Sequence, residues 1–422
     1  MTARWTALLL AFALLLPLGA APARAESETG TSGVEAEAEP AGGEIEEIPE
    51  DPDGTLSFEN LDRRMMAHYY PILSLQESID DLEGRDYEWR EDYLRTSINS
   101  LSGYQWIIAT MSPLGTESSA YQSMQTQYDR MRSEFDDIRD GKTQQEDEDA
   151  LRQYRNAQNQ AVFAGETLYI ALLDMLANNE ALTRQIAQLD RTVRELELRF
   201  ELGQVPELTV AQAKSGRAQA ISGQKTLEMN INAYLLQLKS MVGAELDTPL
   251  SLGALPAVTQ EQLDAMDLTA DLKQAMEASY ELFDAKKQLD DFRVNTYEKV
   301  IDSIGTYEKY FEVSQVTHAL QAMQYGYDNT LLNYELNFRA LFAQVGDCAQ
   351  ILEAKRTALE TQESSYAVSQ LKYEQGNISA NALADAKDEL DAARSAVSAA
   401  ERELFSKYRS YCWAVEYGIL NG

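Results

Sequence analysis

Apolar residues recur along most of this chain at intervals of three and four, which is the spacing of an amphipathic helix. The first such run begins just after Ser57, which can cap a helix, and a second run begins in the same way at Leu268. Two much longer runs contain no proline, from about Glu146 to Leu202 and from about His318 to Gln375. The pattern predicts an all-α fold of long coiled-coil helices with little or no β-structure.

A short motif occurs twice and divides the chain into two similar halves. Phe200 stands three positions before Gly203 in the first copy, and Tyr373 stands three positions before Gly376 in the second. Glycine accepts the left-handed backbone conformation that commonly ends a helix, so each copy predicts a tight turn. An Ala-containing run with helical spacing follows each glycine. We therefore expect two antiparallel helical hairpins, with tips near residues 203 and 376.

The remaining segments indicate how the chain is divided. Arg4, the apolar stretch 7–16 and the small-residue site at 23–25 are typical of a signal peptide for export. The acidic segment that follows has no basic residue and too little apolar content to fold alone. The expected organisation is a signal peptide at 1–25, a disordered acidic leader at 26–54, a first helical repeat at 55–247, a linker at 248–261 and a second helical repeat at 262–422. Inside the first repeat we expect an extra helix at 116–141 and a polar linker at 142–149.

Charge and motif content narrow the function. The formal net charge is −33, and nucleic-acid binding needs clustered Lys and Arg, so we expect no nucleic-acid partner. The two histidines, His68 and His318, have no second metal ligand at helical spacing. The sequence has no phosphate loop, nucleophile elbow or zinc motif, and its many carboxylates have no distinctive spacing. We expect no metal, no cofactor and no catalytic activity.

Cys348 and Cys412 are the two thiols of the chain, and an exported protein can form a disulfide. When the second hairpin is folded about its tip, the residue that faces Cys348 lies about one helical turn from Cys412. A disulfide tolerates little such displacement. A Cys348–Cys412 bridge and two buried thiols are the two alternatives.

The order of these elements resembles that of the TolC-like outer membrane efflux proteins, and the resemblance covers most of residues 56–418. It implies that three chains assemble into an α-helical tunnel in the cell envelope. It also implies that an adaptor protein docks at the hairpin tips and connects the tunnel to an inner-membrane transporter. The docking residues implied by the resemblance are Phe200, Leu202, Gly203, Gln204, Tyr373, Gln375, Gly376 and Asn377.

The resemblance also assigns candidate tunnel-mouth residues. Asp385 matches an acidic position of the family in the second repeat, and Gln212 occupies the same position in the first. The chain departs from the family at Ala382, where some members carry a second acidic residue, and at Ile378, where a basic latch residue is found. A latched gate ringed by aspartates is therefore not expected.

The family crosses the outer membrane on strands that lie between the first and second long helices of each repeat. A membrane strand needs about 9–11 residues of alternating polarity, and the windows 97–121 and 303–317 hold no convincing pair. We predict that the chain lacks these strands. The first hypothesis is a TolC-like component of an efflux or type I secretion apparatus, in the outer membrane by resemblance. The alternatives are an exported coiled-coil scaffold without transport activity and, third, an exported binding protein or enzyme.

Overall fold

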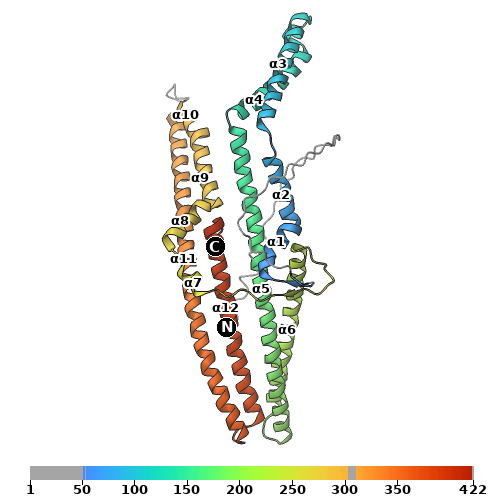
Figure 1. Cartoon of the computed structure of the whole chain (residues 1–422), viewed down its shortest axis with the longest axis vertical. Coiled ribbons are helices and arrows are strands. Elements are labelled where there is room, and N and C mark those ends of the chain that lie inside the picture. The colour runs from blue at the N-terminus through green and yellow to red at the C-terminus, as the bar shows by residue number, and fades with distance from the viewer. Residues whose placement is uncertain (1–50, 53, 303–309, 421–422) are drawn as a thin grey trace. The chain divides into compact units, whose positions relative to one another are not determined.

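The structure is a computed structural model that describes residues 51–52, 54–302 and 310–420. The signal peptide, most of the acidic leader and residues 303–309 of the second window lie outside the described residues. The described part is all-α as predicted, with two short strands (Figure 1). The elements of the first repeat are β1 (Thr55–Leu56), α1 (Phe58–His68), α2 (Tyr70–Glu83), α3 (Tyr87–Met111), the 3₁₀ turn η1 (Gly115–Glu117), α4 (Ser119–Arg139), α5 (Lys142–Glu201) and α6 (Glu207–Met241). They are followed by β2 (Ser251–Leu252), α7 (Gln260–Asp264), α8 (Leu268–Ala278), α9 (Tyr280–Phe292), the π-helical turn η2 (Arg293–Glu298), α10 (Lys299–Asp302), α11 (Tyr310–Glu374) and α12 (Ala380–Tyr417).

Two long antiparallel hairpins, α5–α6 and α11–α12, form the frame of the fold (Figure 1). One stretch of α5 is apolar enough to span a membrane by length and composition. Its Phe163, Tyr169 and Leu172 are buried in the main hydrophobic cluster, as expected of a core helix in a folded protein. The apolar residues that recur at helical spacing in this stretch therefore pack against neighbouring helices.

Each repeat opens with two short helices, where the apolar pattern predicted one continuous helix. Ser57 caps α1 as predicted, its Oγ accepting a hydrogen bond from the Asn60 amide. α1 then ends at His68. The extended backbone of Tyr69 separates it from α2, and Pro71 lies in the first turn of α2. The second repeat breaks in the same way at the buried Ser279, whose Oγ accepts from the Leu282 amide. The breaks turn the chain without interrupting the apolar stripe.

The polar linker expected at 142–149 is wrong, because these residues form the first two turns of α5. Gly141, at φ 76°, separates α4 from α5. The polar side chains are held by ionic contacts: Arg85 reaches both carboxylate oxygens of Asp147, at 2.8 and 2.9 Å, and Lys287 lies 2.6 Å from Asp149. A helix surface stabilised by ion pairs resembles a loop in composition, which explains the error.

The segment expected as a linker at 248–261 holds a short strand and the start of a helix. β2 pairs in parallel with β1, with Thr55 opposite Ser251 and Leu56 opposite Leu252. Thr259 then forms a capping box with Gln262 at the start of α7. The beginning and the end of the first repeat are thereby joined side by side.

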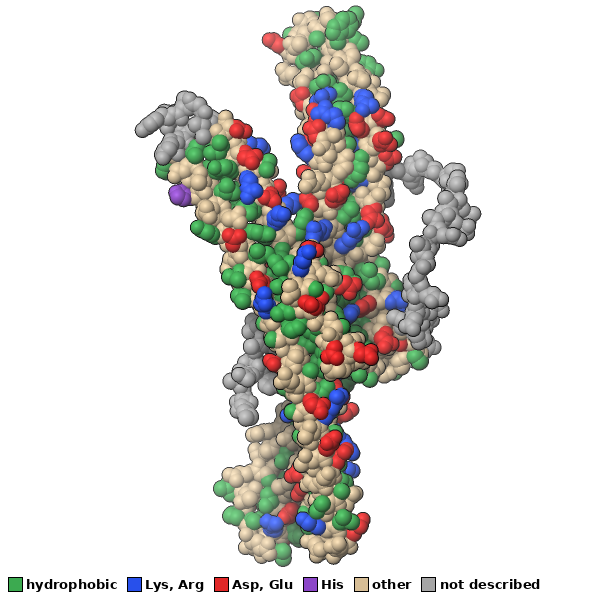
Figure 2. Space-filling view, turned by 60° about the vertical axis from the view of Figure 1, so that its left-hand side comes forward, with side chains coloured by type: hydrophobic (Ala, Val, Ile, Leu, Met, Phe, Trp, Pro, Cys, Tyr) green, Lys and Arg blue, Asp and Glu red, His purple; other side chains and the backbone are tan. Residues whose placement is uncertain are grey.

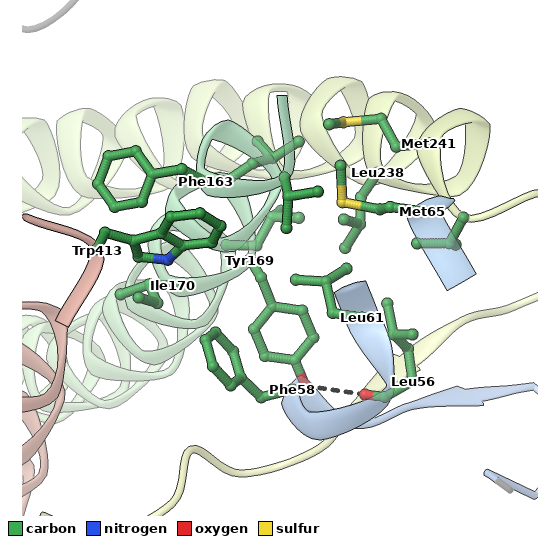
Figure 3. Close-up of a cluster of buried hydrophobic side chains, with 14 of the residues drawn as sticks. Leu56, Phe58, Leu61, Met65, Phe163, Tyr169, Ile170, Leu238, Met241 and Trp413 are labelled. Carbon is green, nitrogen blue, oxygen red and sulfur yellow. Dashed lines mark hydrogen bonds between the residues drawn. The ribbon is translucent and has the colours of Figure 1, made fainter. Parts of the chain in front are cut away.

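A buried tyrosine in each long hairpin holds the opening segment of its repeat against the segment that closes it. The Tyr169 hydroxyl lies 2.8 Å from the Leu56 carbonyl oxygen and 2.9 Å from that of Gly253 (Figure 3). In the second repeat, the Tyr334 hydroxyl lies 3.0 Å from the Ala275 carbonyl oxygen and 3.2 Å from that of Gly418. Burial raises the pKa of both hydroxyls, so both remain protonated donors.

The main hydrophobic cluster draws on both repeats. Phe405 and Trp413 of α12 pack with residues of α1, α5 and α6, and Figure 3 shows Trp413 directed toward Phe163 and Ile170. A second cluster lies among α8, α9, α11 and α12, and a small third one joins α3 to α4. Packing in the first cluster therefore couples the first repeat to the return helix of the second.

A buried ionic group lies beside the main cluster. Glu166 of α5 is 1 % exposed and accepts hydrogen bonds from Arg409 Nε at 2.7 Å and from Trp413 Nε1 at 2.8 Å. Arg409 also reaches Asp62 of α1, at 3.4 Å. Desolvation and the nearby Glu166 charge raise the pKa of Asp62 to about 7, although Arg409 opposes the shift.

The two tyrosine hydroxyls can be tested by removal. Tyr169→Phe and Tyr334→Phe should each lower the free energy of unfolding by about 2 kcal/mol, because buried carbonyl groups lose a donor. Urea unfolding measures the effect. Tyr70, a residue that is 82 % exposed, provides the control: Tyr70→Phe should change stability by less than about 0.5 kcal/mol. Equal effects at all three positions would contradict the role assigned to the buried pair.

Asp62 should make stability depend on pH. Its pKa in the folded state lies above the ordinary value of 3.8, so the folded protein binds the proton more tightly than the unfolded chain. Stability should therefore fall as pH rises from about 4 to about 7. Asp62→Asn should remove this fall and stabilise the protein at pH 8 by about 1 kcal/mol, since the side chain is 40 % exposed and partly screened.

The control for Asp62 is a carboxylate whose pKa moves the other way. Backbone amides of Ala270 and Thr269 lower the pKa of Asp267, so Asp267→Asn should leave the fall between pH 4 and 7 in place. Urea unfolding across this range distinguishes the two variants. A pH profile of Asp62→Asn that matches the wild type would show that another group causes the dependence.

Candidate functional site

The first hairpin tip is closed by a hydrogen-bonded glycine turn. Gly203 has φ 69°, its amide donates to the Phe200 carbonyl oxygen at 2.8 Å, and the Gln204 amide donates to that of Arg199 at 2.8 Å. This pair of bonds is the Schellman motif, which needs a left-handed residue after the helix. α6 begins at once with Pro206 at its N-cap. The chain thus reverses over five residues, 202–206.

The second tip repeats this turn bond for bond. Gly376 has φ 72°, its amide donates to the Tyr373 carbonyl oxygen at 2.8 Å, and the Asn377 amide donates to that of Lys372 at 2.8 Å. Ser379 caps α12 through a 3.1 Å bond from the Ala382 amide to its Oγ. An added Cβ would meet no atom within 4 Å at either glycine, so backbone conformation alone requires glycine here.

Both tips expose apolar side chains to solvent. Phe200 and Tyr373 are 44 % and 43 % exposed, and Leu202 is 64 % exposed. Gln204, Gln375 and Asn377 are also exposed, with Asn377 donating to Gln375 Oε1 at 3.1 Å. Sequence reasoning missed three further exposed apolar residues beside the turns, which could have been found as leucines at outward helical positions: Leu198, Leu208 and Leu371.

Ionic contacts link the two hairpins close to their tips. Arg191 of α5 pairs with Asp388 and lies 3.7 Å from Asp385, both on α12. The Asn381 amide lies 3.4 Å from a Glu195 carboxylate oxygen. These partners are far apart in sequence, so no local sequence pattern could indicate the pairing.

The two candidate tunnel-mouth residues have different surroundings. Asp385 is exposed and lies beside Arg191, so part of its charge is compensated within the chain. Gln212 lies on α6 and is exposed. Arg191, which sequence reasoning did not single out, is the basic partner at this end of the hairpins.

The cysteines are free thiols. Cys348 is buried in the second cluster and Cys412 is half-buried, and they form no disulfide. Burial raises the pKa of both thiols, which keeps them protonated at neutral pH. Of the two alternatives left by the sequence, the structure has two unbridged thiols.

Comparison with known proteins places the fold. No protein-family profile matches the sequence, and no curated protein sequence is similar to it. The chain is similar in structure to a membrane protein from Pseudomonas aeruginosa, with a TM-score of 0.51 and 11 % sequence identity over 85 % of this chain and 90 % of that one. Two further similar structures are the outer membrane protein VceC from Vibrio cholerae (TM-score 0.45, 14 % identity, 85 % and 96 % covered) and the Campylobacter jejuni outer membrane channel CmeC (TM-score 0.41, 13 % identity, 82 % and 86 % covered).

The Pseudomonas protein is matched over nearly the whole of both chains. The two hairpin repeats, each turning at a left-handed glycine, are the architecture implied by the sequence resemblance. The chain has the TolC-like fold, with two repeats of long antiparallel helical hairpins.

Proposed function

We propose that this protein is a TolC-like component of an efflux or type I secretion apparatus, and not an enzyme. In this proposal the chain assembles as a homotrimer into an α-helical conduit of the cell envelope. The observation that carries it is the pair of tips with the same hydrogen-bonded turn, each with a partly exposed aromatic residue three positions before the glycine, Phe200 in the first and Tyr373 in the second. A plain structural coiled coil has no need for two matched apolar tips.

The tips are proposed to dock an adaptor protein, which in turn contacts an inner-membrane transporter. Exposed leucine and aromatic side chains supply the apolar centre of an interface, and the neighbouring amides supply polar contacts at its rim. The turn backbone is hydrogen-bonded within the chain, so docking does not require the tip to become ordered. Asp385 and Gln212 are proposed to line the tunnel mouth, with Arg191 holding Asp385 in place.

An exported coiled-coil scaffold without transport activity is the second candidate. The observation that favours it is the helical hairpin α3–α4. α3 occupies residues 97–111 of the window 97–121, where the family that the sequence resembles has membrane strands. The oligomeric state separates the two candidates. The conduit requires a trimer, whereas the scaffold can act as a monomer.

Oligomerisation and docking can be measured on the purified exported chain. Light scattering should give three times the chain mass, and a monomer would overturn the conduit. If a neighbouring gene encodes an adaptor, as the conduit requires, Leu202→Ser combined with Tyr373→Ser should weaken binding of that adaptor about tenfold, because two exposed apolar contacts are lost. Met229 of α6, 68 % exposed, offers a matched control: Met229→Ser should leave binding unchanged. Equal binding by the tip variant and the control would argue against docking at the tips.

The turn itself can be tested with alanine. Gly203→Ala and Gly376→Ala should each cost about 1 kcal/mol, because only the left-handed backbone is strained. Gly418→Ala should cost distinctly more, since its Cβ would lie 2.3 Å from the Ser279 Cα atom. Urea unfolding ranks the three variants. A tip variant as damaging as Gly418→Ala would mean that the tips carry packing as well as a turn.

A further inference from the structure

The α3–α4 hairpin ends in an apolar tip that is exposed on the described chain. We call residues 104–114 the α3–α4 tip; they cover the last two turns of α3 and the start of the connection to α4. Figure 2 shows hydrophobic side chains gathered at this end of the molecule, where charged side chains are few. The exposed apolar residues of the tip, with their exposed fractions, are Tyr104 (60 %), Trp106 (69 %), Ile107 (43 %), Met111 (81 %) and Leu114 (66 %).

Charged residues are almost missing from this end of the hairpin. Between Arg95 and Asp129 the sequence holds a single charged residue, Glu117, although 25 % of the whole chain is charged. Charge returns in the stem, where Arg90 pairs with Glu134 across the two helices at 2.5 Å. Exposed helices ordinarily keep their outer faces charged, so packing within the chain does not explain a neutral tip.

The backbone of the tip is closed by its own hydrogen bonds. The Ser112 amide donates to the Ile108 carbonyl oxygen at 3.0 Å, and the Gly115 amide donates to that of Ser112 at 3.0 Å. The side chain of Ser118 accepts from the Tyr121 amide at 3.2 Å and caps α4. Between the helices, Gln105 is nearly buried and bonds to Gln125 at 3.1 Å. Backbone that leaves water must be satisfied in this way.

We propose that the α3–α4 tip inserts into the interfacial region of a lipid bilayer. Trp and Tyr are the side chains that favour the level of the lipid headgroups, and Ile107, Met111 and Leu114 supply apolar surface for the acyl boundary. A chain of net charge −33 is repelled by an anionic surface, and the neutral tip is the part best suited to approach one. The α3–α4 tip is formed by other residues than the hairpin tips at 203 and 376, and its insertion does not depend on transport.

The position of the apolar residues favours lipid over a second copy of the chain. They lie at the end of the hairpin, whereas helices that pair with another copy expose a stripe along their length. The sides of the stem expose two aromatic residues, Trp89 and Tyr93, and otherwise carry ion pairs, among them Arg95 with Asp92 at 2.8 Å and Arg132 with Asp136 at 3.0 Å. An apolar tip on a charged stem fits a hairpin that inserts its end into the membrane surface while its stem stays in water.

Flotation of the exported chain with phosphatidylcholine vesicles tests the proposal. The wild-type chain should float with the vesicles, and 0.5 M salt should not release it, because the contact is apolar. Trp106→Ser combined with Met111→Ser should lower the floating fraction about tenfold. The control is Trp89 in the stem, which is 62 % exposed and stacks on Tyr93: Trp89→Ser should float like the wild type.

A second variant tests whether a loss of flotation comes from misfolding. Leu114→Asp places a charge in the exposed turn and should also reduce flotation while the helical circular dichroism stays unchanged. Failure of the wild type to float, or an equal loss in Trp89→Ser, would overturn the proposal. Normal flotation of the tip variants with an altered mass by light scattering would show that a second copy covers the tip instead.

Discussion

A carboxylate removed from water must be paired with donors. The carboxylate of Glu166 is buried in this way beside the main hydrophobic cluster, so its partners must be held there too. It is 1 % exposed, and the donors that satisfy it, Arg409 and Trp413, both come from the last helix of the chain. Removing one member of such a group leaves an uncompensated buried charge, which costs far more than the pair contributes. The first repeat therefore cannot bury its long helix without the return helix of the second. The two repeats fold as one unit although their sequences look like separate modules.

The same helix pair is joined by polar contacts all the way to the hairpin tips. Below Glu166, Arg402 lies 2.6 Å from Asp174, and the Ser395 hydroxyl lies 2.6 Å from Arg184. Arg191 continues the series with Asp388. α5 and α12 thus keep one antiparallel register from the core to the tip. Their contacts are mainly apolar at the main cluster and polar or ionic between the cluster and the tips. Charge pairing aligns the two hairpins at the end that we propose to dock an adaptor.

The sequence was sufficient for local features and insufficient for those that depend on distant partners. The hairpins could be predicted because glycine at 203 and 376 and the serine cap at 57 act through neighbouring backbone. The first turns of α5 were misjudged because Arg85 and Lys287, which hold them, lie far away in the chain. The breaks at Tyr69 and Ser279 leave the apolar period intact, so the period could not reveal them. At the candidate site, the aromatic and glycine positions were predictable, but the pairing of Arg191 with α12 was not.

The contacts of Tyr169 and Tyr334 suggest how a chain with two such repeats can arise by duplication. Each hydroxyl holds the segment that opens its repeat against the segment that closes it, as Tyr169 does for Leu56 and Gly253. A repeat closed in this way returns the chain to the place where it entered. A second copy appended there begins next to the first and needs no long connection to reach its partner. Tandem duplication of such a unit preserves the interior of each copy. The new interface between the copies can then change separately, and the buried contact of Glu166 with Arg409 belongs to that interface.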